Sequence, residues 1–400
     1  LDNTVVRIPA GNFSFGSSIL IQRSNVVLRG AGAGVTNITF TGGGWGEIDV
    51  SKMGYPANDN YGSSVTKSSW TSGYTKGTNT ITLANTSGLS KGSVITLDQV
   101  DGNGLANLSV SQAPYSSSQQ GCSQDCGRPG RSMRQLVTVE SVVGNTVTFA
   151  PGQYLYLNWN TFTGANPEAW WWPKYNQIDN VGIENMTLTS GPSPHLISFT
   201  ATQNSWVKGN TLVNANRSHV AVEYSRGIEI RENKITKHAN VASDAYGVRI
   251  TMAGDTLVED NVFDTLANAV GTQSSTGNVI SYNYILNMVY SAPGWLPETI
   301  MTHGGHSYMN LFEGNIMPNF YFDDIHGSGS HNVIFRNRAF GWQADRNGTN
   351  SAIPIQYEYW NKYQSAIGNV LGKQGFHTSY GSIYSVDKLP QSGTFNGTTV

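Results

Sequence analysis

An asparagine recurs through the second half of the chain in nearly the same local setting each time. Three residues before most of these asparagines stands an apolar residue, such as Val207 or Ile230, and two residues after them stands another, such as Leu212 or Ile235. This pattern predicts a repeated unit made of a short strand, a tight turn that holds the asparagine, and a second strand. Steps of 22 to 32 residues separate the eight positions, which are Asn185, Asn210, Asn233, Asn261, Asn283, Asn315, Asn337 and Asn369.

One such unit cannot bury its own apolar face, but units stacked about 4.8 Å apart share a continuous core and satisfy each other's backbone. Asparagine suits the turn because it tolerates a left-handed φ, and its amide can bond the asparagines above and below. The apolar residues alternate as in strands and do not follow a 3.6-residue period, which excludes a helical solenoid. We therefore expect an all-β chain, a right-handed parallel β-helix with a small β-rich insertion.

Composition agrees with a folded all-β chain and narrows its partners. Hydrophobic residues make up 38% and charged residues only 12%, with 45 glycines, which is not the composition of a disordered chain. The formal net charge is −2 and no basic run occurs, so nucleic acid is not an expected partner. No apolar stretch approaches the roughly 18 residues of a membrane span. We expect a monomer whose partner is a polysaccharide substrate.

The rhythm of the repeat divides the chain into four parts. We expect residues 1–44 to form the first turns of the β-helix and residues 178–372 to form the main β-helix. Between them, residues 45–177 predict a β-rich insertion with aromatic loops, in which Gly144-Asn145 forms a hairpin turn. Residues 373–400 predict a remnant of the coil and a tail. Cys122 and Cys126, in the string GCSQDCG, predict a small disulfide.

The N-terminal segment resembles the opening turns of a known superfamily. VRIPAG at residues 6–11 and SNVVLRGAGAG at residues 24–34 are similar to the first rungs of pectin-lyase-like right-handed parallel β-helix proteins. The resemblance covers about residues 4–40 and 178–372, and it implies a polysaccharide lyase or a polygalacturonase-type glycoside hydrolase. DDIHG at residues 323–327 resembles pieces of the polygalacturonase-type motif. It implies Asp323 and Asp324 as candidate carboxylates and nothing further, because the NTD and RIK strings of that family are absent.

Strand alternation predicts which polar side chains point outward. Where Val248 and Ile250 point into the core, Arg249 points out, and the same reasoning applies to each following turn. On the turn that contains Asp324 and His326, we expect the side chain of Ile325 to point inward and those two side chains to point outward. The predicted outward stack, with neighbours about 5 Å apart, is Arg249, Gln273, His303, Asp324 with His326, and Glu358.

The candidate catalytic residues come from this stack and its loops, and the loops add candidate substrate contacts. The longer repeat steps should bulge out on one side, where repeat proteins usually bind. The predicted catalytic set is Asp324, Glu358, His303, His326, Arg249, Asp323 and Glu298. The predicted substrate contacts are Gln273, His306, Asp244, Trp295, Trp342, Trp360 and Gln356. No metal or cofactor is expected, although calcium stays open because some lyases of the superfamily that the chain resembles use it.

Two mechanisms fit a groove on such a coil. An inverting hydrolase needs an acid of raised pKa and a carboxylate base roughly 6.5–9.5 Å apart, and a lyase needs a base and a cation beside a uronate. Lys and Arg total only 24, whereas Trp and Tyr number 10 and 19. Aromatic rings suit the apolar faces of neutral sugars, so we favour a secreted hydrolase of a neutral or weakly acidic glycan. A polysaccharide lyase, or a non-catalytic glycan-binding or tail-spike-like protein, remains the alternative.

Overall fold

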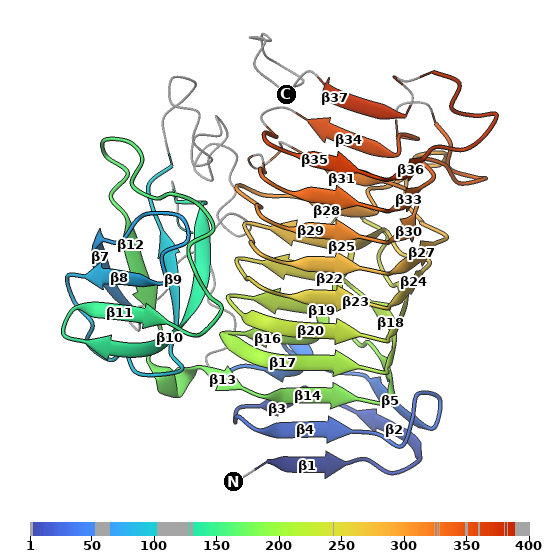
Figure 1. Ribbon diagram of the computed structural model, residues 1–400. Helices are drawn as coiled ribbons and strands as arrows, with labels where there is room; N and C mark the ends of the chain where they lie inside the picture. The colour runs from blue at the N-terminus through green and yellow to red at the C-terminus, as the bar shows by residue number, and fades with distance from the viewer. Residues whose placement is uncertain are drawn as a thin grey trace.

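The chain winds into a coil of three long parallel sheets, with a closed antiparallel barrel beside it (Figure 1). The computed structural model describes residues 3–52, 65–101, 128, 131–242, 244–323, 325, 327, 329–348, 351–358, 361–379, 381 and 383–388. The coil rises from its N-terminal strand to its C-terminal strand, and each full turn adds one strand to each sheet. Apart from the short 3-10 helix η2 (Lys174–Asn176), the described residues form strands, turns and loops.

The strands of the coil are short, and each pairs in parallel with its counterparts one turn below and above. The first sheet contains β1 (Thr4–Arg7), β4 (Val26–Arg29), β13 (Ile178–Asp179), β14 (Val181–Glu184), β17 (Thr202–Lys208), β20 (Arg226–Arg231), β23 (Leu257–Glu259), β26 (Val279–Ser281), β29 (Leu311–Glu313), β32 (Val333–Phe335) and β35 (Ser365–Ile367). The second sheet contains β2 (Gly11–Phe15), β5 (Thr36–Phe40), β15 (Thr187–Thr189), β18 (Thr211–Ala215), β21 (Lys234–His238), β24 (Val262–Asp264), β27 (Tyr284–Leu286), β30 (Ile316–Met317), β33 (Arg338–Ala339) and β36 (Val370–Leu371). The third sheet contains β3 (Ile19–Ile21), β6 (Gly46–Val50), β16 (His195–Thr200), β19 (Ser218–Glu223), β22 (Tyr246–Thr251), β25 (Asn268–Gln273), β28 (Ile300–Thr302), β31 (Phe320–Phe322), β34 (Ile355–Glu358) and β37 (Tyr384–Lys388).

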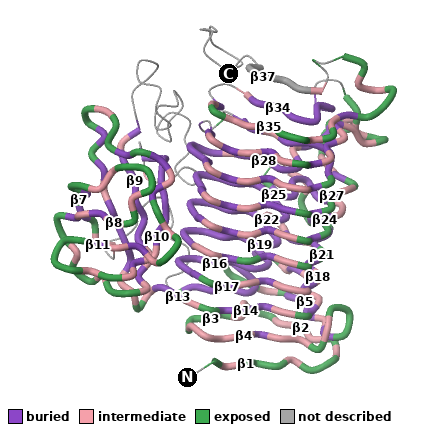
Figure 2. The backbone as a smooth tube through the Cα atoms, viewed as in Figure 1, coloured by how far each residue is buried: buried purple, intermediate pink, exposed green. Residues whose placement is uncertain are grey.

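Apolar columns run up the inside of the coil. In the second sheet Leu212 pairs with Ile235, and Ile235 pairs with Phe263 on the next turn, and all three are fully buried. Figure 2 shows buried residues along the length of the coil. The all-β prediction and the stacked apolar flanks of the asparagines are therefore confirmed.

The recurring asparagines form a ladder inside the turn between the first and second sheets. The side-chain amide of one asparagine donates to the side-chain oxygen, Oδ1, of the asparagine one turn above, over 3.0–3.2 Å. That same oxygen also accepts the backbone N–H of the asparagine below, as in the 3.1 Å bond from Asn261 to Asn283. The seven members are Asn210, Asn233, Asn261, Asn283, Asn315, Asn337 and Asn369.

Two details of the ladder differ from the prediction. The left-handed φ falls on the residue before each asparagine, as at Glu232 (+57°) and Asp260 (+54°), and not on the ladder asparagine itself. Asn185, which has a φ of +58°, also occupies this preceding position. Met186 takes the ladder position of that turn, and its backbone N–H donates to Asn210. Tolerance of left-handed φ was therefore the wrong reason for these asparagines, whereas inter-turn bonding was the right one.

A second, shorter ladder lies at the turn between the third and first sheets, and sequence reasoning did not find it. The side-chain amide of Asn278 donates to Asn310 over 2.8 Å, and that of Asn310 donates to Asn332 over 2.9 Å. The backbone N–H of Asn332 then donates to the side chain of Gln364. Hydrogen bonds of these side chains therefore connect four successive turns at this corner of the coil.

Between β6 and β13 the chain forms a closed barrel of six antiparallel strands. They are β7 (Thr66–Ser72), β8 (Thr80–Leu83), β9 (Val94–Asp98), β10 (Arg134–Val143), β11 (Thr146–Phe149) and β12 (Glu168–Trp171). β10 and β11 are joined by the two-residue turn Gly144-Asn145, in which Gly144 has a φ of +57°. The coil also includes β6, which ends at Val50, five residues beyond residue 45, where the sequence suggested that the insertion begins. Cys122 and Cys126 lie outside the described residues.

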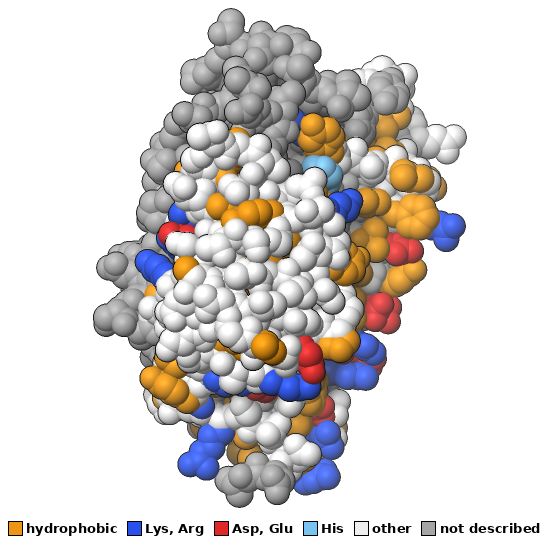
Figure 3. All heavy atoms as spheres, turned by 60° about the vertical axis from the view of Figure 1, so that its left-hand side comes forward, with side chains coloured by type: hydrophobic (Ala, Val, Ile, Leu, Met, Phe, Trp, Pro, Cys, Tyr) orange, Lys and Arg blue, Asp and Glu red, His pale blue; other side chains and the backbone are white. Residues whose placement is uncertain are grey.

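Tryptophans fill the barrel and its contact with the coil. Trp171 belongs to the barrel core, whereas Trp170 and Trp172 pack against Tyr224 and Met252 of the coil. All three tryptophans are at most 5% exposed. Trp170 and Trp171 thus lie on β12 and not in a loop, and all three rings are enclosed by protein. In Figure 3, charged and hydrophobic side chains cover only a small part of the outward side of the barrel.

Among the described residues, no helix has the length and apolar character needed to cross a membrane.

Replacing one ladder asparagine should destabilise the whole coil. Asn283→Ala removes an amide that donates to Val258 O and to Asn315, and an oxygen that accepts two bonds from Asn261. Because the partners are buried, we expect a loss of about 2–4 kcal/mol in the free energy of unfolding, measured by denaturant unfolding. Asn12→Ala, at an exposed position of β2, should change it by less than about 0.5 kcal/mol. Equal effects of the two substitutions would contradict the ladder's role.

A buried histidine pair predicts acid sensitivity. Burial lowers the pKa of His219 to about 3 and the pKa of His238 to about 4, and their rings lie 4.9 Å apart. Below the ordinary histidine pKa, the unfolded chain binds a proton that folded His219 refuses, so stability falls as pH falls. Between pH 6.5 and pH 4.5, the free energy of unfolding of the unmodified protein should therefore fall by about 2–3 kcal/mol more than that of the His219→Gln variant. Urea unfolding at both pH values measures this difference, and parallel losses would contradict it.

Candidate functional site

A pocket of about 410 Å³ lies over the outer face of the third sheet, near the C-terminal part of the coil. Its floor comes from β28, β31 and the residues that directly follow them, because their side chains alternate with the inward Ile300, Thr302, Phe320 and Phe322. Its walls come from the longer turns that lead into the third sheet. The lining residues are Arg217, Asp244, Tyr246, Tyr290, Glu298, Met301, His303, Tyr321, Asp323 and Ile325.

His303 and Asp323 form a close pair on the floor of this pocket. Each directly follows a strand, and successive turns of the sheet place the two residues next to each other: the backbone N–H of Asp323 donates to Thr302 O. His303 Nδ1 lies 2.5 Å from Asp323 Oδ2, and the carboxylate is fully buried. Asp323 therefore fixes the orientation of the imidazole, and with Nδ1 as donor the proton-accepting nitrogen is Nε2.

Glu298 enters the pocket from the loop between β27 and β28. Burial raises the pKa of Glu298 above its ordinary value, and the nearby carboxylates of Asp323 and Glu358 add to the rise. The His303 ring opposes this effect. A carboxyl group of raised pKa beside other carboxylates is the pattern by which enzymes separate an acid from a base.

Glu358 lies one turn above, on the same outward column as Asp323. Its Oε1 accepts a bond from the Tyr321 hydroxyl over 2.5 Å and another from the Gln356 amide over 3.2 Å. Burial, followed by the charge of Glu358, raises the pKa of Tyr321 far above its ordinary value, so the phenol stays protonated. The Tyr321 hydroxyl therefore remains a hydrogen-bond donor to Glu358 on the next turn.

The lower part of the predicted outward stack is closed to a ligand. Arg249 points outward as predicted, but it is fully buried and paired with Glu223 over 2.9 Å. Gln273 is 1% exposed, and it accepts from Thr251 and donates to the Tyr246 hydroxyl. These two residues were predicted as a catalytic cation and a substrate contact, but in the structure they belong to a buried polar network.

The predicted register around residue 325 was shifted. The strand β31 consists of Phe320–Phe322, and Ile325, which we expected to point inward, is 50% exposed. The carboxylate that continues the outward column directly after this strand is therefore Asp323. Asp324, His326 and Trp360 lie outside the described residues, and their predicted roles stay predictions.

Three of the predicted substrate contacts lie at the edges of the pocket. Asp244 lines it and lies 3.6 Å from Arg217. Trp295, which is 36% exposed, and Gln356 line a small hollow beside it, and this hollow shares Glu298 and Tyr321 with the pocket. Glu298 and Tyr321 thus stand between the pocket and a partly exposed aromatic ring.

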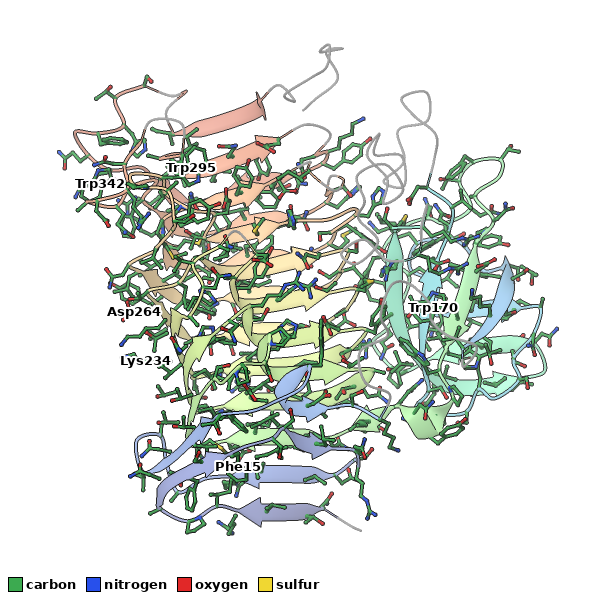
Figure 4. The ribbon with its side chains drawn as sticks, turned by 180° about the vertical axis from the view of Figure 1, so that it is seen from behind. Phe15, Trp170, Lys234, Asp264, Trp295 and Trp342 are labelled. Carbon is green, nitrogen blue, oxygen red and sulfur yellow. The ribbon has the colours of Figure 1, made fainter. Side chains whose placement is uncertain are left out.

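The remaining two predicted contacts lie elsewhere. Lys373 Nζ lies 4.8 Å from the ring centre of Trp342, which is on the turn between β33 and β34. His306 is 1% exposed and faces the barrel residue Asp101. In Figure 4, Trp170 lies in the barrel, whereas Trp295 and Trp342 lie on the other side of the coil near its C-terminal end.

Several pocket residues escaped sequence reasoning. Tyr321 could have been found, because in the string FYF the alternation puts it outward once both phenylalanines are taken as inward. Met301 follows the same alternation between the inward Ile300 and Thr302, whereas Arg217 carries no comparable signal. The described residues form no group of three or more His, Cys, Asp or Glu side chains that could hold a metal ion.

Comparisons with known proteins agree with this architecture. A family model described as "Right handed beta helix region" matches residues 171–294. No curated protein matches the sequence. The fold is similar to that of the tailspike of Pseudomonas phage phi297, at a TM-score of 0.58 and 14% identity, covering 92% of this chain and 62% of the tailspike. The chain thus spans about three fifths of that protein's length.

Two further solved structures are similar at lower scores. The tailspike of Pseudomonas phage LKA1 has a TM-score of 0.46 at 14% identity, with 92% of this chain and 70% of that chain covered. DFA-IIIase from Arthrobacter chlorophenolicus has a TM-score of 0.41 at 11% identity, with 96% and 77% covered. The family model and the phi297 tailspike confirm the predicted right-handed parallel β-helix, and at such identities a likeness establishes the fold alone.

The raised pKa of Glu298 can be tested without a substrate. Glu298→Gln removes a charge that burial disfavours, so we expect it to raise the free energy of unfolding at pH 7. The gain should shrink as the pH falls toward 4, because the carboxyl group of the unmodified protein then becomes protonated in both the folded and the unfolded state. Thermal melts at both pH values measure it, with Glu229→Gln at an exposed position of β20 as the control. A loss of stability at pH 7 would contradict the assignment.

Proposed function

We propose that this protein is a glycoside hydrolase that cleaves a neutral or weakly acidic glycan in the pocket on the third sheet. The observation that carries the proposal is the environment of Glu298, a carboxyl group of raised pKa that shares the pocket with the His303–Asp323 pair. Hydrolysis of a glycosidic bond needs one carboxylic acid that holds its proton and a second group that activates water. Both kinds of group line this pocket.

In this proposal Glu298 donates its proton to the glycosidic oxygen as the bond to the leaving sugar breaks. Water attacks the anomeric carbon from the opposite face and loses its proton to the His303–Asp323 pair, at Nε2 of the imidazole. Asp323 keeps the ring oriented and stabilises the imidazolium that forms. The carbon–oxygen bond made to water replaces the one broken, so the anomeric configuration inverts.

The charges of the pocket favour hydrolysis over β-elimination. A lyase needs a cation to neutralise the uronate carboxylate, and Arg249, the residue that we expected in that role, is buried against Glu223. Of the charged residues that line the pocket, Arg217 faces Asp244, while Glu298 and Asp323 add further carboxyl groups. Such a lining lacks the excess of cations that a uronate requires. Tyr290, which lines the pocket and is partly exposed, offers its ring to an uncharged sugar.

We propose further that the enzyme acts outside the cell, since a polymeric glycan would be met there.

Activity on a panel of glycans tests the proposal. We expect new reducing ends without a rise in absorbance near 235 nm, the signal of the unsaturated product of a lyase. Asp323→Asn and His303→Ala should each lower kcat at least ~100-fold, the usual effect of losing an acid or base. Asp260→Asn is the control, because it lies in an exposed turn with a left-handed φ of +54° that asparagine also tolerates.

Three results would count against the proposal. Unsaturated product would indicate a lyase, and tight glycan binding without cleavage would indicate a binding protein. Near-unchanged turnover in both site variants, with a folded protein by circular dichroism, would remove the pocket from the reaction.

A further inference from the structure

The loop that follows β28 connects the proposed active site to the barrel. It begins with His303 on the pocket floor, where the backbone N–H of His303 donates to Thr272 O. Three residues further on, His306 faces the barrel, and Tyr308 enters the barrel's apolar core. One short segment therefore carries the catalytic imidazole at one end and barrel contacts at the other.

Tyr308 binds the barrel and the coil at once. Its side chain is fully buried, and its hydroxyl donates to the backbone oxygen of Arg134, at the start of β10, over 2.8 Å. Its own backbone N–H donates to Ser275 O of the coil over 3.1 Å. The hydroxyl bond thus ties the loop to the edge of a barrel strand.

His306 supplies a second contact with the barrel. It is buried, has a left-handed φ of +58°, and its Nε2 lies 3.8 Å from Asp101 Oδ1. The carboxyl group of Asp101 accepts bonds from the backbone N–H and the hydroxyl of Ser132 over 2.9–3.1 Å, and the charge of Arg134 also acts on it. A left-handed histidine is strained, and such a residue persists only where its surroundings hold it. Here Asp101 of the barrel is part of those surroundings.

We propose that the barrel is a positioning element for the reaction, holding the loop that carries His303 through the contacts of Tyr308 and His306. This inference rests on the proposed role of His303 in glycan hydrolysis. Tyr308, His306 and Asp101 are positioning residues, because they act on the substrate only through the placement of the imidazole. A misplacement of about 1 Å is enough to lower a rate ~100-fold, so loosening this loop should lower kcat and leave the KM nearly unchanged.

The protonation of Asp101 fits such a contact. Burial raises the pKa of the Asp101 carboxyl to about 7, and burial lowers the pKa of His306 to about 3. At neutral pH the contact therefore involves a neutral imidazole and a carboxyl group that is protonated in part. An asparagine at position 101 resembles the protonated form in shape and charge, whereas an alanine leaves a gap.

Two matched tyrosine variants test the positioning role. Tyr308→Phe removes one hydroxyl bond between barrel and coil on the His303 loop, and Tyr156→Phe removes another, the 2.6 Å bond to Asp255, which lies two turns of the coil below. We expect Tyr308→Phe to lower kcat about 10-fold with a KM within about 3-fold, and Tyr156→Phe to leave both unchanged. In NMR spectra, the titration curve of the His303 ring should shift only in Tyr308→Phe.

Equal effects of the two tyrosine variants on kcat and on the His303 titration, or no effect of either, would overturn the proposal. The NMR measurement needs no substrate, so it tests positioning even if the protein cleaves no glycan. Should Tyr308→Phe not fold, the pair Asp101→Asn and Asp101→Ala replaces it. Asn should keep the His303 titration of the unmodified protein and Ala should shift it, and identical curves in both would overturn the inference.

Discussion

The parallel pairing of each turn with the next is the constraint on which this molecule depends. A single turn has no core, so its apolar side chains and backbone polar groups are satisfied only by the turns below and above. The asparagine ladder fixes that stacking at one corner, since Asn261, Asn283 and Asn315 each bond the backbone and the amide of a neighbouring turn. Side chains far apart in the sequence are thereby held about one strand spacing apart, about 4.8 Å.

The candidate site follows from this register. His303, Asp323 and Glu358 come from three successive turns, and the sheet places them on one outward column. Longer turns between the second and third sheets then add Asp244 and Glu298 above the column. The coil thus supplies rigid spacing, and the longer turns supply the walls and the group whose pKa is raised. The barrel adds contacts on the other side of the same segment, through Tyr308 and Arg134.

Sequence reasoning worked where one period decided the outcome. The apolar flanks of Asn210 to Asn369 predicted the coil, and alternation correctly turned Arg249, Gln273, His303 and Glu358 outward. Sequence reasoning failed at β31, which ends at Phe322. An error of one residue in the inward–outward alternation after this strand selected Asp324 as the outward carboxylate in place of Asp323. Outward direction is also not exposure. Arg249 is covered and paired with Glu223, and no local pattern in the sequence reveals that burial.

Hydrolysis in this pocket is best tested by a crystal structure of the Glu298→Gln variant with an oligosaccharide that the unmodified enzyme cleaves. Hydrolysis in this pocket requires the glycosidic oxygen to lie within hydrogen-bond distance, about 3 Å, of the side chain at position 298, with the anomeric carbon facing His303. A glycan bound on the barrel, or on a face of the coil away from the His303–Asp323 pair, would contradict it.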